Sequence, residues 1–375
     1  MLQQKGDEEA MNRRAFLATS TVGATASVAL PFAAAMEVPL LGETGNPLPV
    51  PAGERLPLGP LSGSRYPDPH IEALDNKRFK GSPGTGAVER VATGFRWAEG
   101  PAYFRAGRYL IFSDIPNNRQ MRLLEDDNHL SVFRSPSYNS NGNTVDRQGR
   151  LITCQHAGRR VVRTELDGRI TIIADSYNGK KLNSPNDVVV ASDDSVWFTD
   201  PSYGIGGNYE GLQAAQEQAT HNVYRVDARS GEVKMLVDDF TQPNGLAFSP
   251  DEKKLYIVDS GITHGGPAHI RVFDVDVGAG KLTNSKVFAE GFAPGFTDGL
   301  RLDVEGNVWA SMGWADPKED GVRCYAPNGD LIGKIHLPET CANLTFGGLL
   351  RNRLYMCAST SIYALYVNTQ GAAVP

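Results

Sequence analysis

Ser184-Pro185-Asn186-Asp187-Val188-Val189-Val190 is one copy of a unit that this chain repeats six times. Each copy opens with an amide or carboxylate residue at the start of an apolar run, then turns and enters a second apolar run. The opening residues are Glu99, Asn141, Asn186, Asn244, Asp298 and Asn343. They follow one another at intervals of roughly 40 to 60 residues, which is the spacing of four-stranded propeller blades with loops of variable length.

The composition agrees with many short strands joined by turns. The chain has 375 residues, of which 41% are hydrophobic and 21% charged, with 40 Gly and 23 Pro. We therefore predict an all-β fold, a six-bladed β-propeller that forms one catalytic domain over residues 87–368. The formal net charge of −6, without a basic face or zinc-finger spacing, argues against a nucleic-acid partner.

The last copy of the repeat lacks one strand, and the residues before the first copy can supply it. After Asn343 the last copy has only three strand-like runs, at residues 344–346, 354–358 and 362–367. We predict that Glu89–Thr93, immediately before the first copy, supplies the missing outer strand. Closing the ring with strands from both ends removes the exposed edges that an open array would have.

The residues before the propeller have the features of targeting and leader segments. Arg13-Arg14-Ala15-Phe16-Leu17 precedes a modestly apolar stretch that ends in Pro31-Phe32-Ala33-Ala34-Ala35. This order is typical of an export signal, and the paired arginines resemble the Tat type. We predict a signal over residues 1–35, a periplasmic location and no membrane association after processing, with an uncleaved amphipathic arm as the alternative. Residues 36–86 are then a Pro-rich extended leader and residues 369–375 a C-terminal tail.

The geometry of the repeat gives the six opening residues a common location. Equivalent positions of blades that rotate about an axis meet at that axis, so the six oxygen-bearing side chains converge on one mouth of the ring. The loops between the second and third strands lie on the same face. Three of them are candidates to border the mouth: a long insertion at residues 203–221, residues 261–269, and the loop after His156. We expect the insertion to act as a lid.

The chemistry of the six residues favours a metal site. Taken singly, Asn and Asp before a strand are more often turn formers than ligands, which leaves a non-catalytic binding propeller as an alternative. Glu99, however, is the least turn-like of the six, and two carboxylates with amide oxygens, without His or Cys, form a set of hard ligands. Such a set suits Ca²⁺, with Mn²⁺ or Mg²⁺ as alternatives and Zn²⁺ or copper less well suited.

Several widely spaced motifs carry a resemblance to a known family. They are Trp97-Ala98-Glu99-Gly100-Pro101, Ser184-Pro185-Asn186-Asp187-Val188, Trp197-Phe198-Thr199-Asp200-Pro201, Gln242-Pro243-Asn244-Gly245-Leu246-Ala247-Phe248-Ser249 and Thr297-Asp298-Gly299. Over roughly residues 87–368 the chain resembles the SMP-30/gluconolactonase family, and its ending from Cys341 to Gly348 is similar to the bacterial gluconolactonase branch. The resemblance implies a six-bladed propeller, a central divalent cation and hydrolysis of sugar lactones.

The resemblance also implies roles for single residues. Carried over by position, the metal ligands are Glu99, Asn244, Asp298 and Asn186, the last being either a direct ligand or a bridge to substrate. The ion would polarise the lactone carbonyl and stabilise the tetrahedral oxyanion while water attacks. Asp298 is the expected general base, with Asp187 and His156 as further candidates.

Substrate contacts are less closely defined by the sequence. We expect them from Asn141, His156, Asp187, Tyr203 and His264. One departure from the family pattern bears on them, because Ser184 stands where some animal members have an arginine.

The predicted activity is the hydrolysis of sugar 1,4- or 1,5-lactones, with a small-molecule lactone as the partner. A metal-dependent esterase or phosphotriesterase on the same site is an alternative, because a fold does not fix a function. The chain has no Gly-x-Ser-x-Gly elbow for a nucleophilic serine. It also lacks the glycine patterns of dinucleotide- and phosphate-binding loops.

Overall fold

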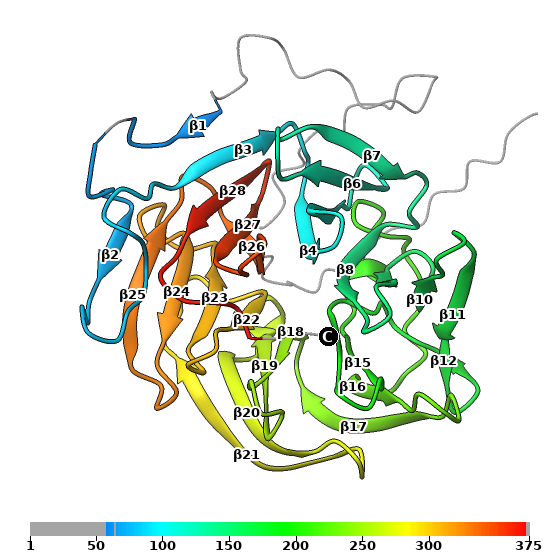
Figure 1. Ribbon diagram of the computed structural model, residues 1–375. Helices are drawn as coiled ribbons and strands as arrows, with labels where there is room; N and C mark the ends of the chain where they lie inside the picture. The colour runs from blue at the N-terminus through cyan, green and yellow to red at the C-terminus, as the bar shows by residue number, and fades with distance from the viewer. Residues whose placement is uncertain (1–57, 64, 373–375) are drawn as a thin grey trace, which may run out of the picture. The chain divides into compact units, whose positions relative to one another are not determined.

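Six antiparallel sheets surround a central axis in the computed structural model of the protein (Figure 1). The structure describes residues 58–63 and 65–372. The predicted export signal at residues 1–35 lies outside the described residues, as do residues 36–57 and 373–375. The all-β, six-bladed propeller predicted from the repeat is confirmed.

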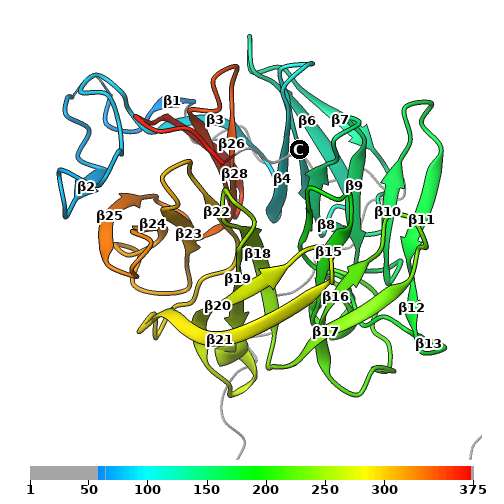
Figure 2. The same cartoon turned by 60° about the horizontal axis from the view of Figure 1, so that its bottom comes forward.

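The first four blades each contain four consecutive strands. Blade 1 contains β4 (Ala98–Phe104), β5 (Tyr109–Asp114), β6 (Arg119–Leu124) and β7 (Leu130–Arg134). Blade 2 contains β8 (Ser140–Val145), β9 (Leu151–Gln155), β10 (Arg160–Thr164) and β11 (Ile170–Ala174). Blade 3 contains β14 (Val188–Val190), β15 (Val196–Asp200), β16 (His221–Val226) and β17 (Val233–Phe240). Blade 4 contains β18 (Pro243–Phe248), β19 (Lys254–Ser260), β20 (Ala268–Asp276) and β21 (Lys281–Glu290). A small hairpin, β12 (Ser176–Tyr177) and β13 (Lys180–Lys181), precedes blade 3, and the long outer strands β17 and β21 stand out in the turned view (Figure 2).

Blades 5 and 6 gain strands from the N-terminal part of the chain. Blade 5 contains β22 (Leu300–Leu302), β23 (Val308–Met312), β24 (Gly321–Tyr325) and β25 (Leu331–His336), with β2 (Ile71–Ala73) antiparallel to β25. Blade 6 contains β26 (Cys341–Gly347), β27 (Arg353–Ala358) and β28 (Ser361–Tyr366). Next to β28 lies β3 (Glu89–Thr93), and β1 (Gly59–Pro60) pairs with β3. The outer strands of the last blade therefore come from the opposite end of the propeller sequence.

The inner strands are apolar on both faces because each one contacts two neighbouring blades. In β14, Val188 and Val190 belong to an apolar cluster with Cys154 of blade 2, whereas Val189 belongs to a cluster with Leu246 of blade 4. This alternation follows from the two-residue period of a strand. The described residues contain six such clusters, one for each pair of neighbouring blades. The core is thus a ring of interfaces around the axis.

The loops on one face contain short helical turns. The segments Tyr203–Ile205, after β15, and Gly261–His264, after β19, form 3₁₀ turns. Residues 212–220, which have some helical periodicity in the sequence, form no helix. Within residues 58–63 and 65–372, no helix is long and apolar enough to cross a membrane.

Glycine follows four of the six opening residues, at Gly100, Gly142, Gly245 and Gly299. At these positions the inner strands of neighbouring blades approach closely. The Gly142 N–H donates to the Asn186 carbonyl at 2.8 Å, and the Gly245 N–H donates to the Asp298 carbonyl at 2.9 Å. A Cβ atom on residue 245 would lie 2.5 Å from that carbonyl oxygen. The blades therefore meet at the axis through main-chain contacts that leave no room for a side chain at these glycines.

Replacing Gly245 with alanine is expected to destabilise the propeller by about 1–3 kcal/mol, the usual effect of overpacking a rigid interface. The thermal unfolding midpoint, followed by tryptophan fluorescence, measures the change. Gly84→Ala is the matched control, because Gly84 is exposed and an added Cβ would have no neighbour within 4 Å. Equal midpoints for the two variants would contradict the close approach of the blades.

Candidate active site at one mouth of the ring

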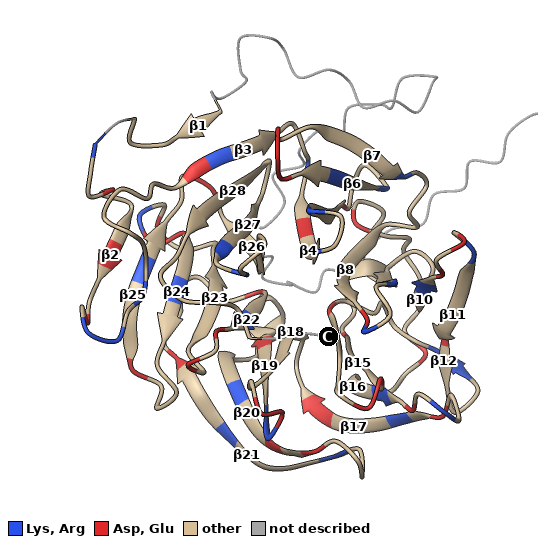
Figure 3. Cartoon of the chain, viewed as in Figure 1, with Lys and Arg blue, Asp and Glu red and all other residues tan. Residues whose placement is uncertain are grey.

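The six opening residues lie within two residues of the start of the inner strands, at one end of the axis. All six side chains are buried, with relative exposures between 1% for Asn343 and 8% for Asp298. Figure 3 shows an acidic segment on β4, whose one acidic residue is Glu99, and β4 is the strand of blade 1 nearest the centre of the ring. The structure thus brings together residues that are far apart in the sequence, as the repeat predicted.

A recurring aspartate fixes the loop that leads into three of these residues. In blades 1, 3 and 4 the second strand carries an Asp at or near its end, and its carboxylate accepts a main-chain N–H from the loop before the inner strand. Asp114 accepts from Arg96 at 3.0 Å, Asp200 from Asn183 at 2.8 Å, and Asp259 from Gln242 at 2.8 Å. These bonds satisfy buried donors and set the path of the chain toward Glu99, Asn186 and Asn244.

The carboxylates at the mouth are held in an unfavourable electrostatic environment. Burial raises the pKa of Glu99 well above its usual range, and the charges of Asp298 and Asp187 raise it further. Burial likewise raises the pKa of Asp298, followed by the charges of Glu210 and Asp187. Both effects disfavour the charged form of a carboxyl group. A nearby cation would relieve both of them.

Several buried oxygen atoms at the mouth have no hydrogen-bond partner. They are Oε2 of Glu99, Oδ1 of Asn141 and Oδ1 of Asn186. Buried polar atoms are normally satisfied, and oxygens of this type are the ligands that hard divalent cations prefer. Asn343 does not join them, because its Nδ2 donates to Oε1 of Glu99 at 2.8 Å and its Oδ1 accepts from Leu344 at 2.8 Å.

The donor set therefore fits a hard cation through a mixture of carboxylate and amide oxygens. Among residues 58–63 and 65–372, no group of three or more His, Cys, Asp or Glu side chains is arranged to hold a metal ion. The predicted set of Glu99, Asn186, Asn244 and Asp298 contains only two such residues, so it depends on the amides. Asn244 is oriented by a hydrogen bond from its Nδ2 to Oγ of Ser260 at 3.1 Å.

His156 supports its neighbours. Asn141 Nδ2 donates to His156 Nε2 at 3.2 Å, and the opposite ring nitrogen, Nδ1, donates to the carbonyl of Glu210 at 2.9 Å. Burial lowers the pKa of His156 to about 4, so the ring is neutral near pH 7. With both nitrogens engaged, His156 holds Asn141 in place and links it to the insertion.

The insertion at residues 203–221 packs directly against the mouth. The Gly204 N–H donates to Oγ of Ser184 at 2.9 Å, and Ser184 donates to the carbonyl of Pro201 at 2.7 Å. A Cβ atom on residue 204 would lie 2.4 Å from Cβ of His156, so glycine is required for this contact. Ser184, the departure from the family pattern, is thus fully buried beneath the insertion.

Tyr203 and His264 come together from neighbouring blades. Their rings meet edge to face with centroids 5.9 Å apart. The Tyr203 hydroxyl donates to the carbonyl of Ser260 at 3.2 Å. Since Ser260 also accepts from Asn244, this pair connects the rim of the mouth to one of the predicted ligands.

Two charged residues near the mouth are absent from the sequence-based site. Arg301 is buried and its Nη1 lies 3.3 Å from Oδ2 of Asp187. Glu210 reaches the site from the insertion, and burial raises its pKa to about 7. Arg301 could have been singled out from the sequence, because it is an arginine within an otherwise apolar inner strand. Glu210 had none, because only the folded insertion places it beside Asp298.

Comparison with known proteins identifies the family and supports the propeller fold. The SMP-30/gluconolactonase/LRE-like region matches residues 97–360. The gluconolactonase of Zymomonas mobilis is 29% identical over 309 residues, which cover 76% of this chain and 82% of that protein. The solved gluconolactonase of Xanthomonas campestris is 32% identical with a TM-score of 0.73, covering 83% of this chain and 97% of its own.

A more distant structure shares the fold. Regucalcin of Agrobacterium tumefaciens, described as a calcium-binding protein, is 18% identical with a TM-score of 0.62, covering 79% of this chain and 97% of its own. The family match spans most of the propeller, from the motif before Glu99 to the last blade. This chain belongs to the SMP-30/gluconolactonase/LRE-like family.

Proposed function

We propose that this protein opens sugar lactones by hydrolysis at the mouth that contains Glu99, Asn186, Asn244 and Asp298. Two relatives named as gluconolactonases, each matching more than two thirds of the chain, support this activity. The observation that carries the proposal is a pair of buried carboxylates next to amide oxygens that have no hydrogen-bond partner. Buried charges of this kind are normally paired or bound to a metal.

The proposed cofactor is a divalent cation, with Ca²⁺ preferred over Mn²⁺ and Mg²⁺ because the donors are all oxygens. Its ligands would be the four residues named above. When bound, the ion supplies a Lewis acid that polarises the lactone carbonyl. The likeness to the calcium-binding regucalcin concerns the fold, so the choice of Ca²⁺ depends on the donor set.

The remaining roles follow from the positions of the chain's own side chains. Asp298 is the proposed general base, since it is one of the two carboxylates among the six opening residues at the mouth. Asn141 presents an unpartnered Oδ1 to the mouth and would bind a substrate hydroxyl. Tyr203 and His264, at the rim, would border the sugar, and the insertion that packs against the mouth would limit the access of water.

Exhaustive chelation is expected to abolish hydrolysis of D-glucono-1,5-lactone, because the buried carboxylates then lack their counter-charge. Re-addition of Ca²⁺, Mn²⁺ or Zn²⁺ in parallel identifies the ion that restores activity. A panel of 1,4-lactones, simple esters and a phosphotriester, assayed with the restored enzyme, separates lactone hydrolysis from its alternatives. Full activity after chelation would eliminate the metal-dependent mechanism.

Asp298→Asn is expected to lower kcat by at least about 100-fold, the low end for losing acid–base assistance. The substitution keeps the shape of the side chain while removing a ligand charge and the proposed base. Steady-state kinetics and metal titration measure both losses, and Asp167→Asn, at an exposed turn, is the matched control. Asn141→Ala should have the smaller effect. The ranking of these residues is wrong if Asp298→Asn stays fully active while Asn141→Ala abolishes metal binding.

We propose that the protein is exported to the periplasm by a twin-arginine signal. The support is the order of segments in residues 1–35, where Arg13 and Arg14 precede an apolar stretch and a run of small residues. Export of the folded chain would suit a ring whose last blade is completed by a strand from the other end of the propeller sequence.

Replacing Arg13 and Arg14 with lysine is expected to leave full-length protein in the cytoplasm, because Tat-type recognition requires the arginine pair. Fractionation with N-terminal sequencing of the wild-type protein should give a mature chain that begins near Met36. Normal processing of the double-lysine variant would refute the Tat signal and leave the enzymatic proposal unaffected.

A further inference from the structure

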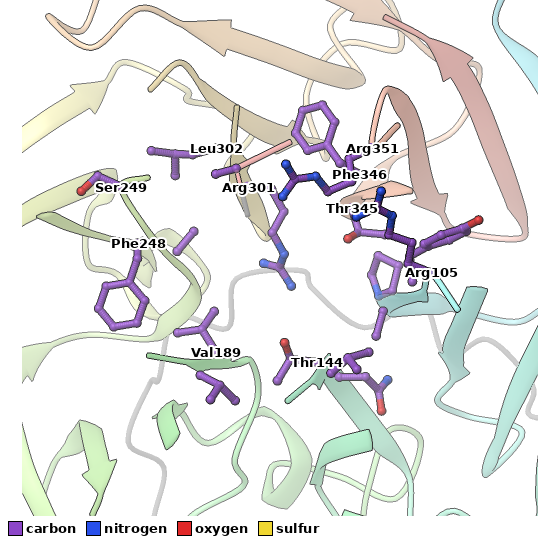
Figure 4. Close-up of a pocket in the computed structure, with 18 of the residues that line it drawn as sticks. Arg105, Thr144, Val189, Phe248, Ser249, Arg301, Leu302, Thr345, Phe346 and Arg351 are labelled. Carbon is purple, nitrogen blue, oxygen red and sulfur yellow. The ribbon is translucent and has the colours of Figure 1, made fainter. Parts of the chain in front are cut away.

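A cavity of about 300 Å³ opens at the mouth of the ring opposite to Glu99 (Figure 4). Its lining residues come from all six blades, and those on the inner strands lie further along the strand than the opening residue of the same blade. Examples are Thr144, Val189, Ala247 and Leu302. The cavity is therefore at the far end of the inner strands, and its walls are mainly apolar.

Three arginines, one from each of the consecutive blades 1, 6 and 5, line this cavity. Arg105 follows β4, Arg351 lies in the turn between β26 and β27, and Arg301 lies within β22. Figure 4 shows Arg301 extending into the middle of the cavity, with Arg105 and Arg351 near Thr345. Three positive charges thus face a small and largely apolar space.

Arg301 is paired with Asp187, but the negative charge in the lining does not balance Arg105 and Arg351. One carboxylate, Glu252, belongs to the lining, and its Oε2 accepts from the Ser192 N–H at 3.0 Å while its Oε1 lies 4.0 Å from Arg147. Within residues 58–63 and 65–372, no hydrogen bond or ion pair engages the guanidinium group of Arg105 or of Arg351. The cavity therefore carries an excess of positive charge.

We propose that this cavity binds a small organic anion, a molecule with an apolar body and one carboxylate or phosphate group. The planar guanidinium group presents paired donors that match the oxygens of either group. The apolar walls, which include Phe248 and Phe346, would cover the body of the ligand. A neutral sugar lactone has neither an apolar body nor an anionic group, so this ligand is of a different class from the proposed substrate.

The two mouths are separated by packed structure. Arg301 Nη1 donates to the Leu300 carbonyl at 2.7 Å and lies 3.3 Å from Asp187, which is next to the predicted ligand Asn186. Arg301 belongs to blade 5 and Asp187 to blade 3, so their contact spans the axis between two blades that are not neighbours. Anion binding and lactone hydrolysis therefore use different sites, and the inference does not depend on the proposed function.

Calorimetric titration of the full chain with hexyl phosphate, hexanoate and hexanol tests the proposal. Both anions are expected to bind at least about tenfold more tightly than the alcohol, because only they form charge-assisted hydrogen bonds with guanidinium groups. The double variant Arg105→Gln/Arg351→Gln should lose this preference and retain its binding of hexanol. Its hydrolysis of D-glucono-1,5-lactone should stay within about twofold of wild type, since neither arginine lies at the mouth with Glu99.

Arg108→Gln is the matched control, because Arg108 is an exposed arginine of the same hairpin as Arg105 and its Nη2 is paired with Asp126 at 2.7 Å. It should keep the preference for anions. The proposal is overturned if hexanol binds as tightly as the anions, if the double variant keeps the preference, or if Arg108→Gln loses it equally. Absence of lactone hydrolysis by the wild-type protein would count against the proposed function alone.

Discussion

The close approach of the inner strands at the axis is the constraint on which the site depends. Gly142 and Gly245 donate their main-chain N–H groups directly to carbonyls of the next blade, and a Cβ atom at either position would overlap that blade. Because the backbones are in contact, the side chains just before these glycines are crowded into one small mouth. Tight main-chain packing thus concentrates oxygen atoms where water has little access.

This crowding explains the electrostatics of the mouth. Glu99 and Asp298 are both buried, and burial raises the pKa of both carboxyl groups. Arg301 lies beside Asp187 and provides a positive charge near them. The opposite mouth has the reverse character, with guanidinium groups around an apolar cavity. The ring therefore has an acidic mouth at one end and a basic cavity at the other, and the Arg301–Asp187 pair lies between the two.

The loops between the strands position the side chains of the site. A repeated aspartate at the second strand fixes the approach to Glu99, Asn186 and Asn244 by the same hydrogen bond in three blades. The insertion at residues 203–221 is peculiar to one blade and reaches the mouth through His156 and Ser184. His156 is better understood as a support than as a base, because it is buried, neutral and engaged at both nitrogens.

The sequence by itself determined the number of blades and the residues that converge. A repeat with a fixed order of amide or carboxylate, apolar strand and turn can be recognised from local pattern, and rotation about an axis then places equivalent residues together. Local pattern also located the three strands that follow Asn343 to within a few residues of their observed bounds.

Only the tertiary structure decided how those residues are used. Asn343 belongs to the repeat, yet both ends of its amide are taken by Glu99 and Leu344. Glu210 and Arg301 enter the site from an irregular insertion and from the interior of a strand, where no repeat marks them. The pairing of polar atoms, the burial of a charge and the path of a non-repeating loop depend on neighbours that are distant in sequence, so they are settled only when the ring is closed.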